Sequence, residues 1–184
     1  RPTTGAIVLR QPFGGMGKSA VGPGIKAGGP NYVAPLMRFE ETADTPDPVN
    51  RSRDTTDLGD TGLDDFCELL QKHAGTLAAE GELRQTIDAV QSYEYWMAEE
   101  FDHPHDHFRL VGEDNFRRYL PMGEIHVRTH PDDSLFEVYG RVVAARTAGC
   151  RTIVSSPPDF DSPLVDLLET ITQDWAGAME FVEQ

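Results

Sequence analysis

The chain has 184 residues, 39% of them hydrophobic, and a formal net charge of −15 at pH 7; this length suits one ordinary domain or two small ones. The acidity argues against broad nucleic-acid binding, which needs phosphate neutralisation, and no apolar run approaches the roughly 18 residues typical of a transmembrane helix. No secretory signal pattern is present and two cysteines do not form a disulfide framework, so we expect a cytoplasmic protein.

The first 38 residues differ in charge from the rest of the chain. They contain five Lys or Arg side chains and no Asp or Glu, whereas the remainder carries 11 basic and 31 acidic residues. Residues 12–32 include seven glycines, which favour close approach of the backbone to a ligand. We expect a glycine-rich extended segment over 1–36, with a short strand near 5–9, and then an Asp-, Thr- and Pro-rich linker over 37–60.

Residues 61–108 form a predicted helical segment. Thr61–Asp64 resembles a capping box with Asp in the place of Glu, and apolar residues then recur at helical spacing. Gly81 interrupts the pattern, so either two antiparallel helices or one broken helix is expected. The apolar positions are Leu63, Phe66, Leu70 and Leu77 with His73, followed by Leu83, Ile87, Val90, Met97 and Phe101.

Residues 109–184 are predicted to be α/β. Strands are expected at 124–128 and 152–155, with a helix between them that opens on a Ser134–Glu137 capping box and stops at Gly149. A second helix begins at Ser162–Pro163 and carries Leu164, Leu167, Leu168, Ile171 and Trp175. This alternating order of strands and helices predicts a right-handed crossover between parallel strands. We therefore expect a partial Rossmann-like parallel sheet with flanking helices.

The two ends of the chain look internal. It opens without Met inside a strand pattern and closes inside a helical pattern at Phe181–Gln184. We therefore expect a piece of a longer polypeptide.

Two nucleotide-binding motifs fit the glycine-rich segment poorly. Gly15–Ala20 matches the loose G-x-G-x-x-A pattern, but the glycine- and proline-rich residues after it favour no helix, which that motif requires. Gly17-Lys18-Ser19 resembles the end of a P-loop, whose first glycine would stand at Pro12. Neither interpretation is favoured.

Other reactive side chains have plain interpretations. His103, His105 and His107 are candidate metal ligands, although an exposed polar loop explains them equally well and is favoured. Cys67 and Cys150 occupy positions that suit small buried hydrophobic residues, and no neighbouring residue lowers a thiol pKa. Ser155–Pro158 ends a strand where α/β proteins often bind ligands, but a structural turn is the favoured interpretation.

The ordered motif Thr4–Gly15, followed by Lys26–Tyr32, resembles the C-terminal end of the catalytic domain of L-glutamate γ-semialdehyde (1-pyrroline-5-carboxylate) dehydrogenase. This family belongs to the aldehyde dehydrogenase superfamily and forms half of the bifunctional proline utilization A proteins. Gly112–Pro121 and Ala145–Cys150 are similar to the C-terminal region of longer members, in which an aldehyde-dehydrogenase-like domain follows the catalytic core.

The resemblance implies roles for three residues. Gly5 and Ala6 match the anchor for the substrate carboxylate, where backbone amides donate hydrogen bonds, and Phe13 matches the aromatic wall of the aldehyde pocket. The parent reaction would be NAD-dependent oxidation of L-glutamate γ-semialdehyde to L-glutamate in proline catabolism. FAD would be present where the parent carries a proline dehydrogenase domain.

The family's nucleophilic cysteine, general-base glutamate and oxyanion-hole asparagine have no counterpart in the chain. We therefore expect no catalytic, cofactor-binding or metal-binding residue here, an inactive isolated chain, and upstream catalytic domains of the same polypeptide as partners, in a homo-oligomeric parent. The alternative is that residues 61–184 are a non-catalytic structural or interaction module that covers the active site or supports oligomerisation. The acidic, bulky segment Thr129–Asp133 favours that alternative, because a phosphate-binding loop at this place would be glycine-rich.

Overall fold

The computed structural model describes residues 32–38, 40, 62–77, 79–107 and 109–184, and the chain divides into two compact units. The first unit comprises Arg1–Thr45 and Pro104–Arg118, and the second comprises Pro46–His103 and Tyr119–Gln184. The described part of the first unit contains a single 3₁₀ turn, η2 (Ala34–Leu36), and an antiparallel bridge between His105 and Arg117. The strand expected at 5–9 lies outside the described residues, and the segment boundaries expected near 36, 60 and 108 stay predictions.

Three parallel strands form the sheet of the second unit. They lie in the order β1 (Glu124–Arg128), β2 (Arg151–Ser156) and β3 (Met179–Glu183). Each paired residue lies 27 positions after its partner, as in 124 with 151 and 152 with 179. The α/β class is confirmed, whereas the helical pattern expected at the end of the chain is wrong. The adjacent apolar residues Phe181 and Val182 fit either a helical or a strand pattern. Pairing with β2 makes the segment a strand.

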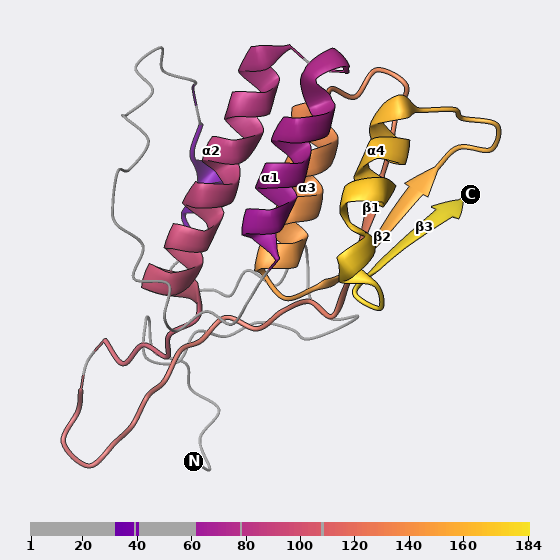
Figure 1. Cartoon of the computed structure of the whole chain (residues 1–184). Helices are drawn as coiled ribbons and strands as arrows, with labels where there is room; N and C mark the ends of the chain where they lie inside the picture. The colour runs from indigo at the N-terminus through magenta and orange to yellow at the C-terminus, as the bar shows by residue number, and fades with distance from the viewer. Residues whose placement is uncertain (1–31, 39, 41–61, 78, 108) are drawn as a thin grey trace. The chain divides into compact units, whose positions relative to one another are not determined.

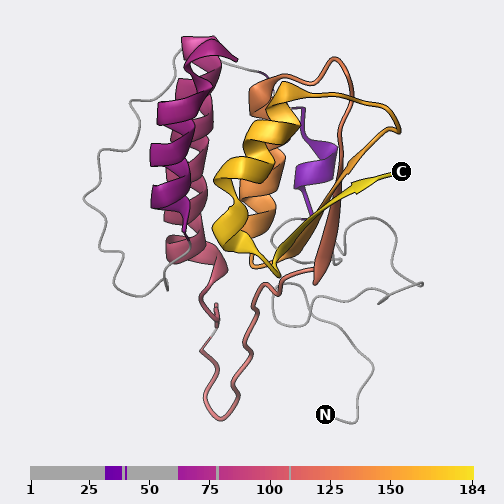
Figure 2. The same ribbon diagram turned by 45° about the vertical axis from the view of Figure 1, so that its right-hand side comes forward.

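The helices of the second unit form two layers on one face of this sheet. α3 (Leu135–Thr147) connects β1 to β2, and α4 (Pro163–Ile171) connects β2 to β3. Figure 1 shows both beside the strands, and Figure 2 shows α1 (Leu63–His73) and α2 (Glu80–Trp96) on their far side. α2 packs chiefly against α3, and α1 packs against α2 and α4.

Local sequence explains the ends of α3 well. The Ser134 hydroxyl accepts from the Glu137 N–H at 3.2 Å, and the Glu137 carboxylate accepts from the Ser134 N–H at 2.8 Å, which completes the predicted capping box. At the other end Gly149 has φ +72°, and the Gly149 and Cys150 N–H groups donate to carbonyls of the last turn. Both predicted helix boundaries are confirmed.

The ends of α4 follow prediction only in part. Pro163 occupies the first turn and Ser162 is the N-cap, but the Ser162 side chain makes no capping hydrogen bond. The helix stops at Ile171, so Trp175 lies in the following 3₁₀ turn, η5 (Gln173–Trp175), and not on the helix as expected.

The helical hairpin begins differently from the prediction. The N-cap of α1 is Gly62, at φ +68° and without a side-chain cap, whereas Thr61, on which the expected capping box depends, lies outside the described residues. A Cβ at Gly62 would lie 2.9 Å from Trp175 Nε1, and this contact explains why glycine occupies the position. The break between helices falls at η3 (Ala74–Thr76), whereas Gly81 lies in the first turn of α2. Of the two alternatives, the antiparallel pair is the one present (Figure 1).

The core of the second unit lies between the helices and the sheet. The Phe66 ring stacks on that of Trp175 with centroids 5.2 Å apart and lies 6.1 Å from the ring of Tyr139. Fully buried residues around these rings include Leu63, Leu70, Val90, Leu135, Val142, Val154 and Leu168. On α2 the expected apolar stripe is only partly correct, because Thr86 and Glu94 are buried beside Val90. Phe101 is exposed and lies beyond α2, in the π-helical turn η4 (Met97–Phe101).

The opposite face of the sheet carries charged side chains on all three strands. Arg151 of β2 makes ion pairs with Glu124 of β1, at 3.0 Å, and with Glu180 of β3. His126 Nε2 lies 3.0 Å from the Glu124 carboxylate on the same strand. Among the described residues no helix has both the length and the apolar character needed to cross a bilayer.

Candidate functional site

The carboxyl ends of the strands are the first place to look for a site, because open parallel sheets bind ligands there. Two connections meet at this edge in the described structure, Thr129–Ser134 after β1 and Pro157–Ser162 after β2. Glu183 of β3 ends at the same edge, because it pairs with Ser156. The connections are short, so the sheet fixes the positions of their side chains.

The N-terminus of α3 is where a Rossmann fold would hold a dinucleotide phosphate. Here two of the backbone N–H groups at this end already have carboxylate partners within the chain. The Ser134 N–H donates to the Glu137 carboxylate at 2.8 Å, and the Leu135 N–H donates to the Glu82 carboxylate of α2 at 3.3 Å. A phosphate at this point would displace or meet two carboxylates, and like charges at contact distance repel.

A pair of hydroxyl groups lies between the ends of β1 and β2. Thr129 Oγ1 is 2.9 Å from Ser156 Oγ and also donates to the Ser155 carbonyl at 3.3 Å. Both side chains are buried. Because each hydroxyl has a protein partner, this pair ties β1 to β2 and fills a structural role. Ser156 itself belongs to β2, so the strand runs one residue beyond the predicted end.

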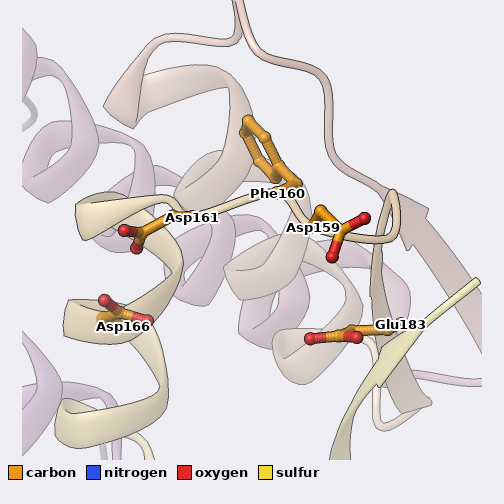
Figure 3. A pocket seen from close by; sticks show the side chains of 5 residues that line it. All are labelled: Asp159, Phe160, Asp161, Asp166 and Glu183. Carbon is orange, nitrogen blue, oxygen red and sulfur yellow. The ribbon is translucent and has the colours of Figure 1, made fainter.

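An open hollow of about 420 Å³ lies over the ends of β2 and β3, and its lining is strongly acidic. Figure 3 shows Asp159 and Asp161 on the β2–α4 connection, with Asp166 on α4 and Glu183 on β3. Phe160 is the only aromatic residue in this lining. Carboxylates in this density repel phosphates and carboxylates. The hollow is therefore no place for an anionic substrate or for a dinucleotide.

The sequence did not point to these carboxylates as a group. Asp159 and Asp161 follow a predicted strand, in a loop near the expected sheet edge. Glu183 was assigned to a helical pattern, so its position at the end of β3 was missed. The acidic residues after Ser156 would have indicated this cluster if a third parallel strand had also been predicted at the end of the chain.

The histidines proposed as metal ligands do not make a metal site in the described residues. The rings of His105 and His107 stack with centroids 5.8 Å apart. His107 Nε2 accepts a hydrogen bond from Arg117 Nε at 3.4 Å, which occupies one of its two nitrogens. Across the described ranges, no group of three or more His, Cys, Asp or Glu side chains is arranged to hold a metal ion.

The two cysteines differ in exposure. Cys150 is buried and follows the C-cap of α3, and its thiol lies 3.9 Å from the Ala148 carbonyl. Cys67 is half-buried on α1 and packs against the core. Their positions agree with the packing roles expected for them.

The residues that the resemblance assigns to substrate, Gly5, Ala6 and Phe13, lie outside the described residues. The structure therefore leaves their roles as predictions. Comparisons with protein-family models, with curated proteins and with solved structures find no match to this chain.

Proposed function

We propose that the chain is a non-catalytic part of an NAD-dependent L-glutamate γ-semialdehyde dehydrogenase. One observation carries the proposal, namely the ordered motif Thr4–Gly15 with Lys26–Tyr32, in which small residues, a Gln-Pro-Phe run and a glycine pair occur in the order typical of that family. In this proposal the Gly5 and Ala6 amides bind the substrate carboxylate, and the Phe13 ring packs on its aliphatic chain. The thiol nucleophile, the general base and the oxyanion hole belong to preceding domains of the same cytoplasmic polypeptide.

For the second unit we propose a non-catalytic structural role, which is the alternative stated in the sequence analysis. In this proposal the unit is part of a Rossmann-related domain that does not bind nucleotide. Two observations support it. The N–H groups of Ser134 and Leu135 donate to the carboxylates of Glu137 and Glu82, and the hollow at the sheet edge is lined by four carboxylates. NAD carries a diphosphate, so the described residues do not fit it, and its binding is assigned to the preceding domains.

The sequence of the intact protein upstream of Arg1 tests the family assignment. The proposal expects a cysteine-containing catalytic loop there, and a preceding sequence without one refutes it. In the intact enzyme, Phe13→Ala should raise the KM for the semialdehyde about tenfold or more, because a buried aromatic wall is worth at least about 1.4 kcal/mol of binding. The KM for NAD should stay unchanged, and an equal change in both constants contradicts a substrate-specific role.

The second unit is tested on the chain itself. Isothermal titration with NAD⁺ and with NADH should show no binding up to millimolar concentrations, and NADH formation from the semialdehyde should be absent. Glu82→Gln and Glu137→Gln together remove both carboxylate charges and keep their hydrogen-bonding oxygens. Dinucleotide binding by the unaltered chain overturns the structural role, whereas binding gained only by the double variant supports charge repulsion as the cause of the loss.

A further inference from the structure

The outer edge of β1 carries backbone groups that have no strand partner among the described residues. β1 ends the sheet on one side, because the strand order is β1-β2-β3. The Arg151 N–H donates to the Gly123 carbonyl, and the Thr129 N–H donates to the Ser155 carbonyl. This alternation makes the odd-numbered residues of β1 the ones that bond to β2. The N–H and C=O groups of Glu124, His126 and Arg128 therefore point away from the sheet.

The side chains of β1 are complementary to those of a second, antiparallel β1. The strand reads Glu-Ile-His-Val-Arg. A two-fold axis at His126 places Glu124 opposite Arg128 of the other copy, and Ile125 opposite Val127. The residues that would exchange hydrogen bonds are the same three whose backbone groups point outward, which is the alternation an antiparallel ladder requires. Opposite charges in cross-strand positions stabilise such a pair.

We propose that β1 of one chain pairs with β1 of a second copy, so that two three-stranded sheets join into one sheet of six strands. The charged face of the sheet supports this partner above others. Glu180, Arg151 and Glu124 already alternate in sign across the strands through ion pairs, and Arg128 of the second copy continues that alternation. On the helix-facing side, half-buried Ile125 gains an apolar neighbour.

The proposal is independent of the dehydrogenase assignment, because it uses only the second unit. It also explains the composition of β1. Edge strands that avoid pairing usually carry like charges or proline, whereas β1 has one negative end, one positive end and no proline. A strand of this kind repels a parallel second copy, since like charges would then face each other, and attracts an antiparallel one.

Size-exclusion chromatography with light scattering on the 184-residue chain gives the first test. We expect a particle of twice the chain mass of 20.4 kDa. His126→Pro removes the outward N–H at the two-fold axis, at an edge position where proline is tolerated because that N–H makes no bond to β2. This variant should be a monomer with an unchanged far-UV spectrum. His126→Thr is the matched control, since it loses the same imidazole contact with Glu124 but keeps the N–H, and it should remain a dimer.

Cross-linking gives a second test that does not depend on how the proline variant folds. In a hydrogen-bonded antiparallel pair, facing Cα atoms are about 5.5 Å apart, which lies within the disulfide range. His126→Cys should therefore form a disulfide-linked dimer under mild oxidation. Arg128→Cys should not, because two copies of residue 128 would lie about 14 Å apart along the strands. The unaltered chain, with Cys67 and Cys150, measures the background.

Three results overturn the proposal. The first is a chain that is monomeric at several hundred micromolar. The second is a dimer that persists in a folded His126→Pro variant. The third is cross-linking of Arg128→Cys that equals the cross-linking of His126→Cys. A chain that stays monomeric on its own but binds a different polypeptide at the β1 edge also overturns the proposal.

Discussion

Replacing Phe66 by alanine tests how α1 is held against the rest of the second unit. Phe66 is 1% exposed, and its ring stacks on Trp175 and lies near Tyr139, which belong to η5 and α3. One side chain thus joins three elements that are distant in sequence. Its removal leaves a cavity between layers that α1 alone cannot close, because Leu63 and Leu70 hold the helix on either side.

The expected loss in the free energy of unfolding is about 3–5 kcal/mol, the usual range for a buried phenylalanine truncated to alanine. The aromatic stacking is included in this figure and contributes about 0.5–1.5 kcal/mol of it. Domains of this size have about 5–15 kcal/mol of stability, so the variant should fold but unfold at markedly lower urea concentration.

Urea unfolding followed by tryptophan fluorescence measures this loss. Trp175 is 4% exposed and Trp96 is 53% exposed, so both proteins should carry Trp96→Phe to isolate the buried indole. Leu77→Ala is the control, because Leu77 is 39% exposed and its truncation should change stability by no more than about 0.5 kcal/mol. A loss below about 1 kcal/mol for Phe66→Ala, or one equal to the control, refutes the role of this ring in joining the three elements.

Three further predictions concern backbone strain, capping and titration. Gly62→Ala should lower the melting temperature, because a left-handed φ costs about 1–2 kcal/mol for alanine and the new Cβ would lie 2.9 Å from the Trp175 indole. Gly81→Ala is the control. Apart from its chain neighbours and its own helix backbone, a Cβ there would have no heavy atom within 4 Å, so this change should be neutral or stabilising. Ser134→Ala should cost about 1 kcal/mol in chemical unfolding, whereas Glu137→Gln keeps the capping box and should cost little. Burial raises the pKa of Tyr139 far above its ordinary value, so the unfolded state loses this proton first and stability should fall as pH rises beyond about 10. The Tyr139 hydroxyl donates to the Leu164 carbonyl at 2.8 Å, so Tyr139→Phe should lose about 1 kcal/mol of stability at neutral pH. It should also show a shallower alkaline decline in unfolding experiments at pH 8 and pH 11.

Elements whose signals are local were predictable from the sequence. The Ser134–Glu137 capping box and the Gly149 stop act within a few residues, and α3 begins and ends where they indicate. The strand at 124–128 follows from its alternation and is present with the expected bounds. These features need no information about the rest of the chain.

Elements decided by distant contacts were not predictable in the same way. The pattern at 181–184 predicts a helix, whereas the pairing of this segment with β2, 27 residues earlier, makes it part of strand β3. The need for glycine at position 62 was not predictable either, because the indole that a Cβ there would meet belongs to Trp175, more than 100 residues away in sequence. The acidic hollow was missed for a related reason, since Glu183 reaches it only as part of β3.

The equal spacing of the two strand pairings has a consequence for the order of folding. Both partners of β2 lie 27 residues away, so the chain-entropy cost of closing either loop is the same. The difference then comes from the helices within the loops. α3 has 13 residues with a capping box, whereas α4 has nine residues and no side-chain cap. We therefore expect β1, α3 and β2 to form the folding nucleus, β3 to dock last, and the amides of β3 to exchange with deuterium before those that join β1 to β2.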